Sequence, residues 1–164
     1  MLELDDRKLD QYRWALFWIS IVIGFAFPYI MYTVVEFFLH HKNLQQIAVD
    51  LHRYYKDSFV LLSTLSIAPF IVFASLTLIR LDKPTILGQE TAFCRLTGAG
   101  LALIVMLAVS IWLQLYILTS NSSTAALGYM WLPICPLFAM PLGYFVGRFV
   151  GKIKFRKRQI SPNK

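Results

Sequence analysis

Histidine residues gather in one short part of the chain and raise the question of metal chemistry. His40 and His41 are adjacent, and His52 follows eleven residues later. Adjacent residues on a helix point apart, whereas a zinc site needs three or four ligands that converge. No cysteine or acidic residue stands at a suitable interval to complete such a site. The spacing therefore predicts no metal and no other cofactor.

Glu36 and His40 raise the question of proton chemistry, because they are four residues apart and could interact across one helical turn. Ionisable groups within a bilayer usually mark transport paths or proton relays. Glu36, however, falls at the outer end of an apolar segment, and the central part of every apolar segment lacks such a group. We therefore expect an ion pair at the membrane surface rather than a relay.

Motifs of known catalytic sites are missing from the sequence, including G-x-S-x-G, H-E-x-x-H and a phosphate-binding loop with a lysine. Cys94 falls at the mouth of one predicted helix and Cys135 inside the next, which argues against a disulfide or a paired redox site. Both are expected to be small buried side chains. The sequence thus predicts a protein that is not an enzyme.

The elements that must position these residues are apolar helices. Hydrophobic residues make up 57% of the 164 residues and charged residues 15%, whereas soluble domains are closer to about 25% charged. No Asp, Glu, Lys or Arg occurs in the 52 residues between Arg95 and Arg148, which is enough for two crossings at about 20 residues each. Two further uncharged runs, Ala15 to Val35 and Ser58 to Ile79, are each long enough for one crossing.

We therefore predict an all-α integral membrane protein with a single membrane domain over residues 1–164. Its four transmembrane helices are expected at about 14–38, 58–79, 96–118 and 126–150. The first helix is expected to be retained, because its flank is not clearly cationic and its apolar run exceeds that of a cleaved signal. A cluster of turn-forming residues, Thr119–Thr124, separates the last two helices.

The basic residues predict the orientation of these helices. Three Lys or Arg residues lie in residues 1–13, three in 39–57, three in 80–95 and seven in 148–164. With both termini in the cytoplasm, thirteen of them lie inside and three outside, which is the arrangement that the bias of Lys and Arg favours. The expected location is the bacterial inner (cytoplasmic) membrane, with the N- and C-termini cytoplasmic.

The outer loop between the first two transmembrane helices is expected to contain an amphipathic helix. Apolar residues recur there at three- and four-residue spacing, and Asn43 and Gln46 have the spacing of a capping box at its start. Its apolar side either covers the end of the bundle or faces an outside partner. The residues of this predicted partner face are Leu44, Ile47, Leu51 and Tyr55.

Five prolines fall inside the predicted helices: Pro28, Pro69, Pro133, Pro136 and Pro141. An interior proline removes one backbone hydrogen bond and bends the helix. In lipid the freed carbonyl groups need partners, which hydroxyl groups such as those of Ser66 and Ser75 can provide. Bent helices occur in transporters and in plain bundles, and without a charge inside the membrane we expect a plain bundle.

Small residues form a matching pattern on two helices. The last predicted helix carries Gly143, Gly147 and Gly151, and the third carries Gly98 and Ala102 at the same expected depth. We call these five residues the glycine seam. Small residues four apart let two helix backbones approach closely in lipid. The glycine seam therefore predicts either packing within one chain or a contact surface for a second copy or another membrane protein.

A basic segment follows the glycine seam and forms the predicted cytoplasmic tail, residues 151–164. An anionic inner leaflet attracts such a segment by about 1 kcal/mol for each basic residue, and nucleic acid passing through the membrane is the alternative partner. The residues expected to make these contacts are Lys152, Lys154, Arg156, Lys157 and Arg158.

In layout the chain resembles the small inner-membrane superinfection exclusion and immunity proteins of temperate phages and plasmids. The resemblance covers nearly the whole chain: a short polar N-terminus, four helices, a modest outer loop and a basic end. It rests on no motif and gives no residue a role. It implies a non-enzymatic protein that blocks an incoming phage genome, conjugating strand or pore-forming toxin by contact with another membrane or envelope protein.

Two other functions compete with this interpretation. One is an accessory subunit of a transporter or of an envelope-assembly complex, in which the prolines would mark a substrate path. The other is a small channel, which needs a water-filled path lined by polar side chains. Gln114 and the hydroxyl groups of the second helix are the few candidates for such a path.

Overall fold

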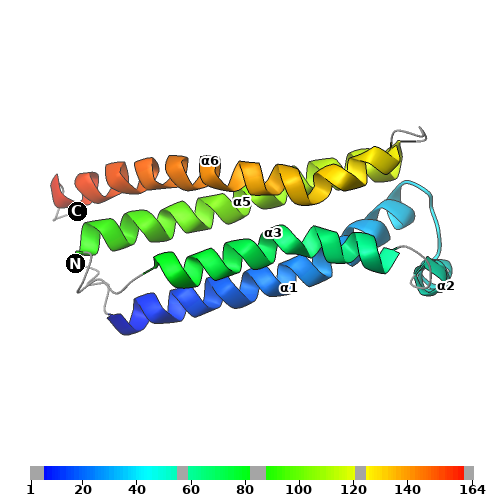
Figure 1. Cartoon of the computed structure of the whole chain (residues 1–164), viewed down its shortest axis with the longest axis horizontal. Coiled ribbons are helices and arrows are strands. Elements are labelled where there is room, and N and C mark those ends of the chain that lie inside the picture. Colours follow the sequence, from blue (N-terminus) through cyan, green and yellow to red (C-terminus); the bar gives the residue numbers. More distant parts are fainter. Residues whose placement is uncertain (1–5, 55–58, 82–87, 121–124, 161–164) are drawn as a thin grey trace.

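The protein is all-helical over the residues that the computed structural model describes, which are 6–54, 59–81, 88–120 and 125–160. Four long helices run side by side, and a short fifth helix lies at one end of them (Figure 1). This confirms the predicted all-α class and the short helix after the first long one. The helices are α1 (Asp6–Phe38), α2 (Leu44–Tyr54), α3 (Phe59–Arg80), α5 (Gln89–Thr119) and α6 (Ala125–Ile160).

The long helices form two antiparallel pairs, α1 with α3 and α5 with α6 (Figure 1). The contact between α5 and α6 is the most extensive in the molecule, and the two pairs meet mainly through α3 against α6 and α1 against α5. Phe70 and Phe73 of α3 pack with Ala102 and Met106 of α5 between the pairs. We call the end that carries α2 the α2 end; α1 begins and α6 ends at the opposite, terminal end.

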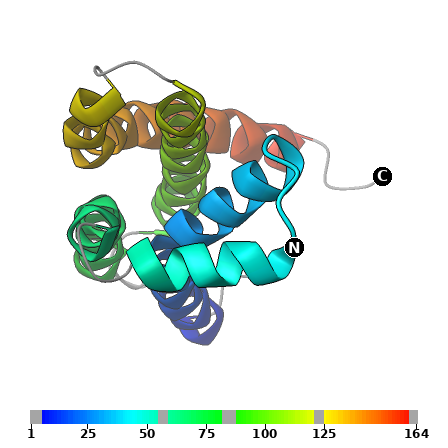
Figure 2. The same cartoon turned by 90° about the vertical axis from the view of Figure 1, so that its right-hand side faces the viewer.

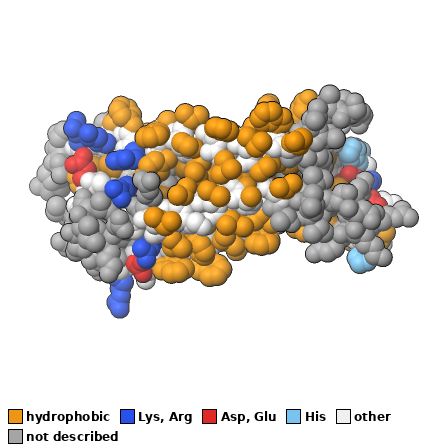
Figure 3. Space-filling view, in the orientation of Figure 1, with side chains coloured by type: hydrophobic (Ala, Val, Ile, Leu, Met, Phe, Trp, Pro, Cys, Tyr) orange, Lys and Arg blue, Asp and Glu red, His pale blue; other side chains and the backbone are white. Residues whose placement is uncertain are grey.

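Large apolar side chains cover the outside of the long helices. On the face shown in Figure 3 they cover the middle of the molecule, and the charged side chains lie toward its two ends. Trp18 is 58% exposed and Phe138 is 75% exposed. Three stretches are long and apolar enough to cross a membrane, Asp10–Phe38, Glu90–Thr119 and Met130–Arg156. These features indicate a membrane protein, because an apolar surface this large is unusual in water.

The four-span prediction is not confirmed at α3. This helix has 22 residues, but the apolar stretch in its described part, Leu65–Ile79, is shorter than the other three. Several of its side chains are buried, among them Ser66, Phe70 and Thr77. The described residues therefore contain three candidate spans and one shorter apolar helix that faces the core.

Three helices extend beyond their predicted limits. α1 begins at Asp6 rather than near 14, and α6 continues to Ile160 rather than ending near 150. α5 begins directly after Gly88, whose φ of 76° is a backbone conformation that favours glycine. The polar residues at these ends are compatible with helix, since Lys, Arg, Glu and Gln all have high helix propensity. The first part of the predicted basic tail is therefore helical.

The prolines lie inside helices as predicted, with Pro28 in α1, Pro69 in α3 and the other three in α6. Ser75 was a predicted partner for a carbonyl group that a proline leaves without its hydrogen bond. Its hydroxyl instead donates to the carbonyl oxygen of Ile71, one turn earlier in the same helix (2.9 Å). Most of the turn predicted between the last two helices, residues 121–124, lies outside the described residues.

Candidate functional site

The structure places the glycine seam inside the chain, between α5 and α6. A β-carbon on Gly147 would lie 2.7 Å from the Cα of Gly98, and one on Gly143 would lie 2.8 Å from the Cα of Ala102. Gly151 lies against Cys94 and Thr97 in the same way. The three glycines that α6 contributes to the glycine seam are all buried. The five residues of the glycine seam thus bring the two backbones together along the terminal half of the helix pair.

An ion-pair cluster joins α1 to α2 at the α2 end. The Nζ of Lys42 lies 2.9 Å from Oε2 of Glu36 and 2.9 Å from Oδ2 of Asp50, and Nδ1 of His40 lies 3.2 Å from Oε2 of Glu36. The expected pair of Glu36 and His40 is confirmed, but Lys42 is the central cation. The hydrogen bond to Glu36, and to a smaller extent the one to Asp50, raises the pKa of Lys42 above its usual value. The ammonium group therefore stays charged at neutral pH.

The turn between α1 and α2 makes this cluster possible. His41 has a φ of 52°, the left-handed conformation that reverses the chain after α1, and the N–H of Lys42 donates to the carbonyl oxygen of Glu36 (3.1 Å). The N–H of Asn43 then donates to Oε1 of Gln46 (3.2 Å), which confirms the predicted capping-box partner. As a result α2 lies across the end of the bundle (Figure 2).

The predicted partner face of α2 is divided by this arrangement. Ile47 is 3% exposed and faces the bundle, Leu51 is half-buried, and Leu44 is 61% exposed. Tyr55 lies outside the described residues. Sequence reasoning missed Val49, which is 65% exposed and lines a shallow hollow beside Lys42 and Asp50. The apolar stripe therefore both covers the bundle and leaves side chains exposed to the outside.

The residues considered for metal or redox chemistry do not gather. His41 and His52 are exposed, and among the described residues no three His, Cys, Asp or Glu side chains are placed to hold a metal ion. Cys94 and Cys135 are free thiols in the structure, the first buried and the second half-buried. Gln114 is buried at 6% exposure near the α2 end of α5.

The basic segment at the terminal end is an exposed helical extension of α6. Lys152, Lys154 and Arg156 are exposed, whereas Phe155 packs against Phe93 of α5 with ring centroids 6.2 Å apart. The side chains of the other two expected contact residues, Lys157 and Arg158, lie outside what the structure describes. The contact of Phe155 with α5 thus holds this part of α6 against its neighbour, and the basic side chains remain exposed.

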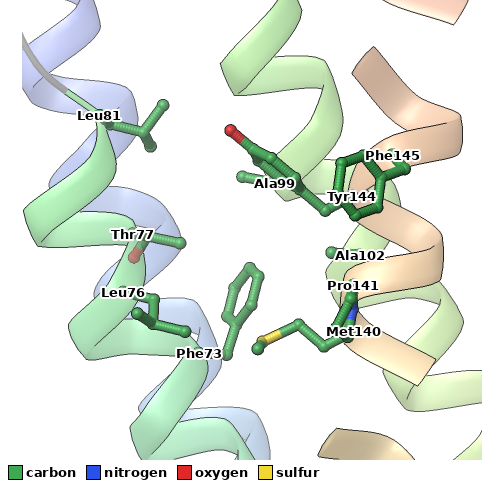
Figure 4. Close-up of a pocket in the computed structure, with 10 residues that line it drawn as sticks. All are labelled: Phe73, Leu76, Thr77, Leu81, Ala99, Ala102, Met140, Pro141, Tyr144 and Phe145. Atoms are coloured by element: carbon green, nitrogen blue, oxygen red, sulfur yellow. The ribbon is translucent and has the colours of Figure 1, made fainter. Parts of the chain in front are cut away.

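A lateral groove between α3, α5 and α6 was not expected from the sequence. Its volume is about 270 Å³. Figure 4 shows its walls, with Phe73 and Leu76 of α3 and Leu81 directly after α3 facing the side chains of α6, and the hydroxyl of Tyr144 pointing across toward α3. The lining residues are Phe73, Leu76, Thr77, Leu81, Ala99, Ala102, Met140, Pro141, Tyr144 and Phe145.

Comparisons with known proteins add no relative: no protein family, curated protein or solved structure matches the chain. The class is therefore defined by the fold and the surface alone. It is an all-helical protein with three helices that are long and apolar enough to span a membrane. Within that class its distinguishing features are the short helix fixed across one end and the cationic helix at the other.

Proposed function

We propose that the protein acts by contact, through the outward surface of α2. The observation that carries this proposal is the ion-pair cluster of Glu36, Lys42 and Asp50, which ties α2 to the end of α1. Large apolar side chains that remain exposed on such a fixed element are suited to binding, because little conformational entropy is lost when a partner docks. Leu44 and Val49 are the apolar side chains concerned.

The proposed topology has four spans, with α3 as the fourth, in the bacterial inner membrane. Its 22 residues correspond to about 33 Å of helix, which matches a hydrocarbon layer of about 30 Å. The antiparallel arrangement puts the start of α1 and the end of α6 at one end and α2 at the other. Since the basic residues are concentrated at the terminal end, we place that end in the cytoplasm and α2 outside.

The topology has a direct test. Reporter domains that are active only in the cytoplasm should be active when fused before α1 and also when fused after α6. A cysteine introduced at Val49 should react with a thiol reagent that cannot cross the membrane and is added from outside. If α2 lay on the cytoplasmic side, the same cysteine would not react with this reagent. Reporters on opposite sides of the membrane would contradict the four-span arrangement.

The biological role that we propose is superinfection exclusion or immunity. In this role α2 docks on a membrane or envelope component of an injecting phage, a conjugation apparatus or a pore-forming toxin and prevents entry. Support comes from the outward-facing contact surface and from the resemblance in layout to exclusion proteins of prophages and plasmids. A resident transporter or assembly complex, with this chain as accessory subunit, is the alternative partner.

The role is tested by expressing the protein in a sensitive host and challenging it with a panel of phages, conjugative plasmids and pore-forming toxins. We expect protection against at least one agent. A double variant, Leu44→Glu with Val49→Glu, should weaken it by an order of magnitude or more, because loss of a central interface contact typically costs about 2 kcal/mol or more.

The control for this experiment is Gln11→Glu, which adds a negative charge at an exposed position of the opposite end. This variant should protect the host as well as the unmodified protein does, and it should be equally abundant in the membrane. Equal sensitivity of the host to every agent would contradict exclusion. Co-purification of a resident transporter through Leu44 and Val49 would assign the same surface to the accessory-subunit role.

A further inference from the structure

The lateral groove opens toward the lipid side of the bundle. Leu76 is half-buried and Phe145 is 67% exposed, so its walls continue into the apolar outer surface of α3 and α6. The groove exists because α5 and α6 are drawn together by the glycine seam, whereas α3 and α6 meet over a much smaller contact. An apolar space that is open to a bilayer is expected to be filled by lipid.

The length and the apolar lining of the groove suit a hydrocarbon chain. From Phe73 to Leu81 the groove follows α3 for about 12 Å. A single acyl chain is narrow enough to enter an apolar space between two helices, and a lipid would also bring a headgroup to one end of it.

Cationic groups lie at the terminal end of the groove, where Leu81 and Tyr144 line it (Figure 4). The guanidinium of Arg148 lies over the ring of Tyr144, 5.9 Å from its centroid, and makes no ion pair within the described residues. Arg13 reaches the same level from α1 and donates to the carbonyl oxygen of Leu81 (3.4 Å), while Asp10 pairs with it (2.6 Å).

The Nε of Arg13 gives an independent sign of an anionic ligand nearby. This atom is buried, and no acceptor for it exists among the described residues. A buried donor without a partner costs about 1–3 kcal/mol, so an oxygen-rich group bound at this level would be favoured. On the acidic side, Glu90 is exposed and Asp10 is already paired with Arg13.

We propose that the groove binds one anionic phospholipid of the cytoplasmic leaflet. One acyl chain fills the space between α3 and α6, the phosphate binds the guanidinium of Arg148, and the hydroxyl of Tyr144 donates to a phosphate oxygen. Basic pockets between transmembrane helices are known sites for anionic lipid headgroups. The bound lipid adds to the contact between α3 and α6, which is far smaller than that between α5 and α6, and this site is separate from the contact function of α2.

The experiment uses the purified full-length protein in mild detergent and phosphatidylglycerol, phosphatidylcholine and inorganic phosphate as probes, with retained ligand measured by native mass spectrometry. We expect one retained phosphatidylglycerol, little phosphatidylcholine and no phosphate. Arg148→Gln should reduce retention about five-fold, the equivalent of about 1 kcal/mol for one basic residue. Arg7→Gln, which removes an exposed arginine at the same end, should leave retention unchanged.

A second pair of variants tests the acyl chain. Leu76→Trp fills the groove and should reduce retention to a similar degree, whereas Ile79→Trp lies on the exposed face of the same helix and should not. Circular dichroism and thermal unfolding identify a variant that fails to fold. Arg148→Gln changes only an exposed side chain, so it keeps the test decisive if Leu76→Trp does not fold.

Three results would overturn the proposal. They are equal retention of phosphatidylcholine and phosphatidylglycerol, equal losses in Arg148→Gln and Arg7→Gln, and a disulfide between two copies that carry Leu76→Cys. The last result would show a second copy in the groove. Since none of these measurements depends on protection against phages or toxins, the lipid site and the proposed function can fail separately.

Discussion

Replacement of Gly147 by leucine is expected to separate α5 from α6 and to lower the amount of protein in the membrane. The new side chain would start 2.7 Å from the Cα of Gly98 and the carbonyl oxygen of Thr97, and backbone atoms cannot move aside as the tip of a side chain can. Overpacking of a core typically costs about 1–3 kcal/mol, and a clash with backbone falls at or above the upper end of that range. Thermal unfolding in detergent and quantitative immunoblotting measure the effect.

A matched pair of alanine variants sharpens this test. Gly147→Ala should still destabilise the protein, whereas Gly100→Ala should be neutral or stabilising, because no atom lies within 4 Å of a β-carbon at Gly100. Alanine is favoured over glycine by about 1 kcal/mol in a helix, so Gly147→Ala should lower the unfolding temperature and Gly100→Ala should leave it unchanged or raise it. Normal abundance of Gly147→Leu with loss of protection would instead assign the glycine seam to a partner.

Replacement of Glu36 by glutamine is expected to release α2 from the end of the bundle. The carboxylate is only 12% exposed and binds Lys42, the cation that also holds Asp50 of α2. Glutamine keeps the shape of the side chain but removes its charge, so the attraction between residue 36 and Lys42 is lost. Amide hydrogen exchange should therefore become faster in α2 and remain unchanged in α5 and α6.

Two comparisons make the result interpretable. Asp10→Asn removes a carboxylate that pairs with Arg13 at the terminal end, and it should leave exchange in α2 unchanged. Alkaline conditions should weaken the same cluster. The raised pKa of Lys42 means that its stabilising contribution is present below the usual lysine value and is lost as the pH rises through the folded-state pKa. Unaltered exchange in α2 of Glu36→Gln would contradict a holding role for the cluster.

The sequence predicted those features that depend on near neighbours in the chain. The contact of Glu36 with His40 and the capping box of Asn43 and Gln46 are visible as spacings of four and three residues, and helix geometry converts such spacings into contacts. The long apolar runs likewise predicted helices. Their ends were less certain, because charged residues with high helix propensity allow α6 to continue into the basic segment.

Features that depend on the path of the chain between elements could not be predicted. Lys42 meets Asp50 eight residues later only because His41 adopts a left-handed conformation. The groove brings Leu76 of α3 beside Met140 of α6, more than sixty residues away, and its width depends on how two helix pairs meet. No local pattern carries that information. The packing of α3 in the core likewise shows only in three dimensions.

The length of α6 has a mechanical consequence. Its 36 residues correspond to about 54 Å, whereas a hydrocarbon layer is about 30 Å thick. The surplus must either stand in the aqueous phase or be taken up by tilting. Because α5 is clamped to α6 along half its length, the two would lean as one rod, and a change in bilayer thickness would swing Arg156 through the headgroup layer.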